Sequence, residues 1–438
     1  MAGNMNESKI LITNYPSVYQ HLTLGRVNNV QETIEVRFGY DFKINSSAMF
    51  LQMARDFITA LLSFDKIYIE GNNIWNIIPI LGCDGLKELL RLHILCIVSD
   101  QNLNPAVITE NHICKYDFLS YSLGKEEINE SNIHKWSYIE NALNQYKIDE
   151  QEKKIILYLI DENSVNLGNE KEVKSRIKEE VRKDILCSKS VFYPNSYRIR
   201  SDGEREYYIP DLIRLQELNK SVILAATLNI NNIKMDAAIN ELMLRKTASA
   251  FSKDVHVGTD ALIRIEQQKG FPDLGELFIK GIVKLDDILK LRNDFQGKIF
   301  RYWAQRTNYE EQLMRQEIMN SVHNILGSKC MNPIRFIGTN LIGLLGFIPG
   351  LAASAFDSFI LDKISKGWHP NFFLDDKLKK MIDDCIAEEH RRNQRKKLNE
   401  AFKDVGRNDP CPCGSGKNIK SATERICDML HIGSLLCL

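Results

Sequence analysis

Two cysteines near the end of the chain are the residues whose type and spacing most directly indicate chemistry. Cys411 and Cys413 are separated by one residue and lie between an Asn-Asp-Pro turn and a Gly-Ser-Gly loop, in "GRNDPCPCGSGK". Two thiolates on such a tight turn are a typical half of a zinc site, in which four ligands surround the ion as a tetrahedron. The sequence therefore predicts zinc as the cofactor, and two further ligands have to be found.

The stretch 406–417 resembles the SEC-C motif, a zinc-binding module found at the C-terminus of the SecA preprotein translocase ATPase and on many otherwise unrelated bacterial proteins. In that pattern, Cys-x-Cys is followed, after eight residues, by Cys-Cys or Cys-His. The second pair would fall where Ala422 and Thr423 stand in this chain, and neither side chain is a zinc ligand. The resemblance therefore implies a zinc site that lacks half of its ligands.

The tail after Lys420 suggests a cause for this loss. "KSATERIC" can be encoded by bases that, read in a shifted frame, give Lys-Cys-His-Gly-Lys-Asp-Met and restore the Cys-His pair in register. We therefore hypothesise that a frameshift near Lys420 replaced the ending of an ancestral chain whose site was complete. The nucleotide sequence tests this hypothesis, because other synonymous codons would refute it.

Three outcomes stay open for the metal in this chain. Cys411 and Cys413 can remain a two-thiolate stub that holds no structural zinc, which is the outcome we favour because so small a module demands strict ligand spacing. Cys427 and His431 can substitute for the missing pair, since their i, i+4 spacing places them on one helical face. Cys437 can also join from the end of the chain. The candidate zinc ligands are Cys411, Cys413, Cys427 and His431.

Composition limits the partners and the compartment. The chain has 438 residues with 57 basic and 57 acidic side chains, so no net charge attracts it to nucleic acid or to an anionic membrane. The cysteines before the tail are isolated in the sequence, which is typical of a reducing cytosol. The start "MAGNMNESKILI" shows no secretory signal, and we expect a cytoplasmic protein.

Hydrophobic periodicity predicts a mainly α protein with a small α/β unit at its N-terminus. A helix at 46–64 precedes a strand in "KIYIEG", and two short helices, "NNIWNIIPILG" and "CDGLKELLRLH", precede a strand in "ILCIVSD". Helices then follow one another, among them a single core helix at 273–296. The predicted domains are a small α/β unit at 1–125, a charged helical region at 126–200, a helical body at 201–372, a charged helical arm at 373–405 and the SEC-C-like tail at 406–438.

An apolar stretch at 336–356 carries no charged residue and is long enough to span a bilayer. Pro349 interrupts it, and Gly346 and Gly350 allow two backbones to approach closely, so we favour a buried Gly-rich hairpin of the helical body. The alternative is membrane insertion, which would make the chain membrane-associated.

The densest basic cluster lies at 390–397, in "HRRNQRKK". Its cations can bind the phosphates of nucleic acid or lipid. We favour a solvated helical face, because acidic residues such as Glu388 and Glu389 stand at spacings that allow intrahelical pairing and no aromatic residues are interleaved.

No catalytic signature is evident, and we expect a protein that is not an enzyme. Pro210 and Asp211, followed by Glu217 and Lys220, only faintly resemble a nuclease constellation, because their spacing is wrong and the segment reads as a helix.

The tail therefore carries the functional prediction. By resemblance, such tails dock proteins onto partners, and in the translocase family these include the ribosome, an export chaperone and lipid. We expect a docking protein, and by analogy a stress- or phage-defence component. Two alternatives stay open: a toxic effector that acts on membranes through 336–356, and an unrecognised hydrolase or nuclease.

Overall fold

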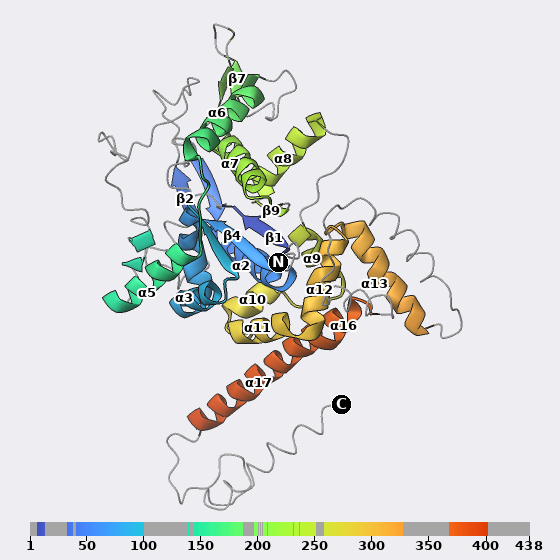
Figure 1. Ribbon diagram of the computed structural model, residues 1–438. Helices are drawn as coiled ribbons and strands as arrows, with labels where there is room; N and C mark the ends of the chain where they lie inside the picture. The colour runs from blue at the N-terminus through green and yellow to red at the C-terminus, as the bar shows by residue number, and fades with distance from the viewer. Residues whose placement is uncertain are drawn as a thin grey trace, which may run out of the picture. The chain divides into compact units, whose positions relative to one another are not determined.

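The computed structural model confirms a mainly helical chain that includes one small parallel sheet (Figure 1). The hairpin predicted at 336–356 and the tail at 406–438 lie outside the described residues. The structure describes residues 7–13, 33–37, 41–99, 148–186, 197–199, 205–207, 209–230, 232–235, 237–250, 258–326 and 368–401, together with 139, 140, 143, 144, 146, 201 and 203.

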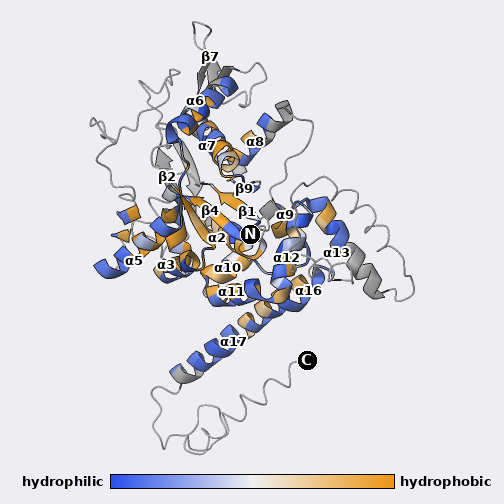
Figure 2. Ribbon diagram, viewed as in Figure 1, coloured by the Kyte–Doolittle hydropathy of each residue, from blue (hydrophilic) through white to orange (hydrophobic). Residues whose placement is uncertain are grey.

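Five parallel strands form the sheet, in the order β6-β5-β4-β1-β9. Ile10 of β1, which lies between β4 and β9, pairs with Ile67 on one side and with Asn232 on the other. β-Branched apolar residues dominate the inner strands because helices cover both faces of such a sheet. Figure 2 shows these strands in orange, the colour of hydrophobic residues. The strands are β1 (Lys9–Ile12), β4 (Lys66–Glu70), β5 (Leu95–Val98), β6 (Ser164–Val165) and β9 (Asn232–Lys234).

The strands predicted in "KIYIEG" and "ILCIVSD" are confirmed as β4 and β5. The other three strands had not been predicted, and β6 and β9 come from beyond the 1–125 range in which the sequence placed the α/β unit. Two antiparallel hairpins accompany the sheet. They are formed by β2 (Thr33–Arg37) with β3 (Asp41–Asn45), and by β7 (Tyr197–Ile199) with β8 (Arg205–Tyr207).

The strand order reverses at β1. From β1 the chain proceeds through β4 and β5 to β6 on one side, and it then returns to place β9 on the other side. Because crossover connections are right-handed, the helices of the two directions cover opposite faces. On one face of the sheet, Leu11 and Val98 form a buried cluster with the helical residues Ile177, Ile223 and Leu224. The fold is therefore a doubly wound α/β sheet.

Helices α2 (Ser46–Ser63), α3 (Ile74–Arg91) and α5 (Glu150–Glu162) belong to the first direction, and α6 (Glu170–Leu186) and α7 (Ile209–Thr227) to the second. The short 3-10 turn η2 (Gly71–Asn73) leads into α3. The prediction of two short helices before β5 is confirmed, because α3 is interrupted at Gly82, whose φ of 68° lies in the left-handed region.

The prediction of one core helix over 273–296 is wrong. The structure divides this segment into α10 (Leu274–Ile279), α11 (Leu285–Asn293) and the start of α12 (Phe295–Arg306). Gly281, with a φ of 69°, ends the first helix, and the Asp294 side chain caps the third by accepting a hydrogen bond from the N–H of Gln296. The apolar positions predicted as core are nevertheless buried, as Leu274 and Ile288 show.

The helical body packs directly on α2. A Cβ atom at Gly275 of α10 would lie 2.5 Å from the backbone nitrogen of Arg55, so the two helix backbones touch there. The aromatic rings of Phe300 and Phe373 stack with centroids 4.3 Å apart. The remaining elements of the body are α8 (Ala237–Ala250), α9 (Gly258–Gln268), α13 (Glu311–Leu326), α16 (Asn371–Phe373) and the π-helical turn η4 (Leu374–Lys379).

The chain divides into two compact units, 1–379 and 380–438. The second unit opens with α17 (Lys380–Ala401), a charged helix that is mostly blue, and hence hydrophilic, in Figure 2. Among the helices that the structure describes, none is both long enough and apolar enough to span a bilayer.

Candidate functional site

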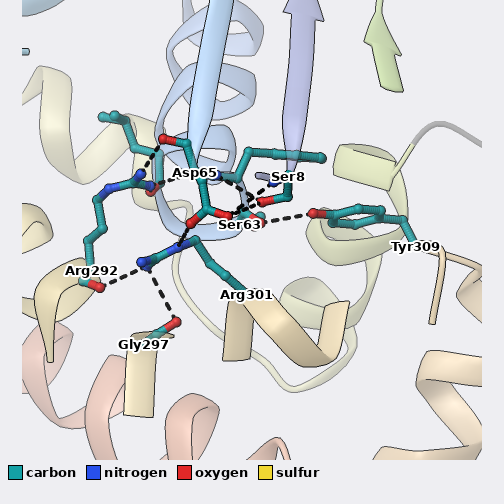
Figure 3. Close-up of polar contacts among 9 residues, drawn as sticks. Ser8, Ser63, Asp65, Arg292, Gly297, Arg301 and Tyr309 are labelled. Carbon is teal, nitrogen blue, oxygen red and sulfur yellow. Dashed lines mark hydrogen bonds and ion pairs between the residues drawn. The ribbon is translucent and has the colours of Figure 1, made fainter. Parts of the chain in front are cut away.

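Two buried arginines lie at the N-terminal end of the sheet, where they join the sheet to α11 and α12 (Figure 3). Asp65 precedes β4 and Ser8 precedes β1, and Asp65 accepts hydrogen bonds from the Ser8 backbone N–H (3.1 Å) and hydroxyl (2.9 Å). Arg301 Nε donates to the same carboxylate over 2.9 Å. Burial alone would raise the pKa of Asp65, but the Arg301 guanidinium and the Ser8 bonds lower it below its ordinary value.

Arg292 holds the turn between α2 and β4. Its guanidinium donates to the backbone carbonyls of Leu61, Phe64 and Asp65, the last over 2.8 Å. The Tyr309 hydroxyl donates to the carbonyl of Ser63 over 3.1 Å. Burial and the neighbouring Arg301 charge lower the pKa of Arg292 to about 9. We shall call Ser8, Asp65, Arg292, Arg301 and Tyr309 the arginine network. It satisfies backbone groups, as a structural joint does.

Charged side chains are also buried at the C-terminal end of the sheet. Glu70 is the last residue of β4, and its Oε2 lies 2.6 Å from Lys220 Nζ of α7; both side chains are 0% exposed. Glu217, one helical turn before the lysine and 16% exposed, lies 2.9 Å from the same ammonium. Among the contacts that the structure describes, Lys220 therefore bridges two carboxylates.

A second group of this kind lies at the end of β9. Lys234 Nζ is 3.3 Å from Asp56 Oδ1 of α2 and also pairs with Asp260 of α9. Successive side chains of a strand point to opposite faces of the sheet. Ile233 packs with the cluster that contains α7 residues, so its neighbour Lys234 lies on the other face, which α2 covers. The alternation along β4 similarly places Glu70 on the face of Tyr68, which also packs with that cluster. The two lysine groups thus lie on opposite faces of one edge.

Asn73 ties the ends of the central strands together. Its Nδ2 donates to the carbonyl of Thr13 over 3.1 Å, and its Oδ1 accepts a hydrogen bond from Asn76 over 2.7 Å. The Thr13 N–H donates to the carbonyl of Lys234 over 2.9 Å, which extends the pairing of β1 with β9 by one residue. The carboxyl ends of these strands are therefore held together by the Asn73 side chain and by backbone pairing, and none of these hydrogen bonds uses the Thr13 hydroxyl.

The structure brings together only some of the candidate residues that the sequence indicated. Glu217 and Lys220 lie together, on a helix as the sequence indicated, and not on the strands that a nuclease constellation requires. Glu70, Asp56 and Lys234 were missed. A charged residue that directly ends an apolar strand, as Glu70 ends "KIYIE", was the available signal.

The basic cluster at 390–397 lies on α17. Arg391 pairs with Glu388 at 2.9 Å and Arg392 with Glu389 at 3.0 Å, so the expected intrahelical pairing is confirmed. The candidate zinc ligands Cys411, Cys413, Cys427 and His431 lie outside the described residues. Within the described part of the chain, no three His, Cys, Asp or Glu side chains are grouped so that they could hold a metal ion.

The Glu266 carboxyl of α9 makes the stability of the fold depend on pH. Burial and the charge of Asp273 raise the pKa of Glu266 to about 7, although Arg55 opposes the shift. The folded chain therefore holds this proton more tightly than the unfolded chain. The stabilisation is complete below pH 4.5, the ordinary value, and is lost as the pH rises to about 7.

Replacing this carboxyl by an amide should remove that dependence. Between pH 5 and pH 8, the unfolding free energy of the wild type should fall by about 1–3 kcal/mol relative to that of Glu266→Gln. Urea unfolding at both pH values measures it. Glu276→Gln, at a half-exposed position of α10, is the matched control. An equal shift in the control would contradict the assignment to Glu266.

Comparison with known proteins supports the SEC-C resemblance of the tail. Residues 407–418 match the family model of the SEC-C motif. The chain is also similar to the protein translocase subunit SecA of Endomicrobium trichonymphae, with 47% identity over 47 residues. That alignment covers 11% of this chain and 6% of the relative's length. No solved structure matches the chain. The SEC-C resemblance is thus confirmed.

Proposed function

We propose that the SEC-C motif is a docking module that holds the α/β body on a protein partner. The match of residues 407–418, reinforced by a SecA similarity that is longer than the motif itself, carries this proposal. The motif follows α17, whose residues from Arg391 to Arg395 are exposed, so charged helix precedes it in the sequence. A short motif outside the body is suited to binding a partner while leaving the body to its own task.

The zinc ligands present in this chain determine how the module can dock. In SecA the SEC-C motif binds zinc, whereas this chain supplies Cys411 and Cys413 and has Ala422 and Thr423 in the positions of the second pair. Two thiolates do not complete a tetrahedral site, and zinc therefore requires further ligands from the tail, for which Cys427, His431 and Cys437 are the candidates. Docking by this chain consequently relies on the residues of the motif loop rather than on a complete metal site.

The partner class follows from the resemblance, with the ribosome and an export chaperone as the two candidates to test. A stress- or phage-defence setting is the physiological context that we propose, by analogy with other free-standing bodies that carry this tail. A membrane-active role through 336–356 stays a separate prediction.

Removal of the tail should abolish docking. We expect the full chain to sediment with ribosomes or to bind a purified export chaperone, and binding to fall at least about tenfold when residues 406–438 are deleted, the equivalent of about 1.4 kcal/mol. A matched variant keeps the tail and replaces Arg391, Arg392 and Arg395 of α17 by alanine. Loss of binding in that variant alone would assign docking to the basic helix and contradict the proposal.

A further inference from the structure

The second half of α17 carries more positive charge than the helix itself neutralises. Arg391 pairs with Glu388 and Arg392 with Glu389. The next three cations are exposed, and none of them forms an ion pair or a hydrogen bond with a residue that the structure describes. These unpaired cations are Arg395, Lys396 and Lys397.

Helix stability does not account for these cations. Positive side chains stabilise a helix through its dipole only within the last turn, and the last turn of α17 contains no basic residue. Arg395 follows Arg391 by four residues, and Lys396 follows Arg392 by the same distance, a spacing at which like charges destabilise a helix. A cluster that works against its own helix indicates a role toward a partner.

The unpaired cations surround an uncharged polar face of α17. At about 100° per residue, Asn393 and Gln394 lie side by side on the helix surface, and Lys397 lies one turn later between them. Arg395 borders this face next to Gln394, and Lys396 borders it next to Asn393. A hydrogen-bonding face is therefore flanked by a positive charge on each side.

This layout selects the partner. The major groove of B-form DNA admits an α-helix and has one phosphate strand on each side. Asn and Gln side chains suit the base edges in that groove, whereas Arg and Lys suit the phosphates. The major groove of A-form RNA is too narrow and deep to be read in this way. A lipid surface requires an apolar face, and residues 388–397 contain no apolar side chain.

We propose that residues 390–397 of α17 bind double-stranded DNA through its major groove. Arg395 and Lys396 contact phosphates of the two opposite strands, and Asn393 and Gln394 face the base edges. This activity goes beyond the docking proposed for the SEC-C motif and does not depend on it. Docking to a purified export chaperone involves no nucleic acid, so each proposal can fail while the other holds.

Fluorescence anisotropy with the full chain measures the interaction. The probe is a short fluorescein-labelled DNA duplex of mixed sequence. Three phosphate contacts predict that the affinity falls about 40-fold between about 50 and 200 mM KCl, because each contact contributes about −0.9 to the slope of log K against log salt. The competitors are the unlabelled DNA duplex, an RNA duplex of the same sequence, and vesicles of phosphatidylserine and phosphatidylcholine. The DNA should compete at least about tenfold better than either of the others.

Removing the unpaired cations should weaken binding. Arg395→Ala/Lys396→Ala/Lys397→Ala should lower the salt slope by about 2.7 and the affinity at low salt at least about tenfold. Alanine favours the helix, so α17 should keep its circular dichroism signal. The matched control removes one arginine and two lysines from exposed positions of α5 and α6 and should leave binding unchanged. This control is Lys154→Ala/Lys171→Ala/Arg176→Ala.

Removing the two glutamates should have the opposite effect. In Glu388→Gln/Glu389→Gln, Arg391 and Arg392 lose their intrahelical partners and become available to phosphates. The salt slope should then steepen by about 1.8, and binding at low salt should tighten several-fold.

Absence of DNA binding at low salt would overturn the proposal. So would a triple variant of α17 that binds DNA as tightly as its control. RNA or vesicles that compete as well as DNA would assign the cations to another class of partner and would equally contradict it.

Discussion

Replacing Ala422 by cysteine and Thr423 by histidine is expected to convert this chain into a tight zinc protein. The two substitutions restore the second ligand pair at the spacing of the SEC-C pattern and complete a tetrahedral set with Cys411 and Cys413. Complete structural sites in small modules bind zinc with about 10–16 kcal/mol, whereas two thiolates alone lack half of the bonds. Competition with a chromophoric chelator should show at least about a thousandfold gain in affinity for Ala422→Cys/Thr423→His.

The control for this gain is the same double variant with Cys411→Ser added, which should return to weak binding. A wild-type chain that already holds one zinc ion as tightly as the restored chain would contradict the expectation. In that case, replacing Cys427, His431 and Cys437 together (Cys427→Ser/His431→Ala/Cys437→Ser) should release the metal, because those residues are the remaining candidate ligands.

Arg292→Met is expected to destabilise the first unit by about 3 kcal/mol or more. Methionine fills the space of the arginine stem, but the carbonyls of Leu61, Phe64 and Asp65 lose their shared donor. The charge removed is one that burial disfavours, as the pKa of about 9 indicates, and this partly offsets the loss. Urea unfolding followed by circular dichroism measures the difference.

Two variants sharpen this experiment. Arg264→Met removes a half-exposed arginine that pairs with Glu311, and should cost less than about 1 kcal/mol. Arg292→Lys keeps the charge but loses the planar fork that serves several carbonyls, so it should be nearly as harmful as methionine. A lysine variant as stable as the wild type would show that charge, rather than the hydrogen bonds, stabilises the turn.

The sequence predicted the parts of the fold that local patterns encode. The strands around Ile67 and Ile97 and the helical face with Ile288 follow from runs and periods of apolar residues. The strand Asn232–Lys234 could not be predicted, because three residues carry no usable period and its place beside β1 depends on pairing with residues far away in the chain. The breaks at Gly281 and Asp294 were present in the sequence as cap signals, but the continuous apolar stripe masked them.

Of the candidate sites, too, only those formed by residues close together in the sequence could be predicted. The tail was found from consecutive residues, since Cys411, Cys413 and the glycines between Gly406 and Gly416 form a rare local pattern. The buried ion pair at the carboxyl ends of the strands brings Glu70 and Lys220 together from two distant segments, and no spacing along the chain relates them. Only the fold reveals such a site.

The position of β9 and of Arg292 has a consequence for how the protein is made. β1 receives its second neighbour only from residues 232–234, and the turn after α2 receives its donor from a residue 231 positions beyond Leu61. The sheet must therefore remain incomplete during synthesis until residues 232–234, a little over halfway along the 438-residue chain, have left the ribosome, and the turn after α2 must wait for residue 292. The apolar surfaces of the amino-terminal strands are exposed over that interval, and we expect chaperones to bind nascent chains of this protein.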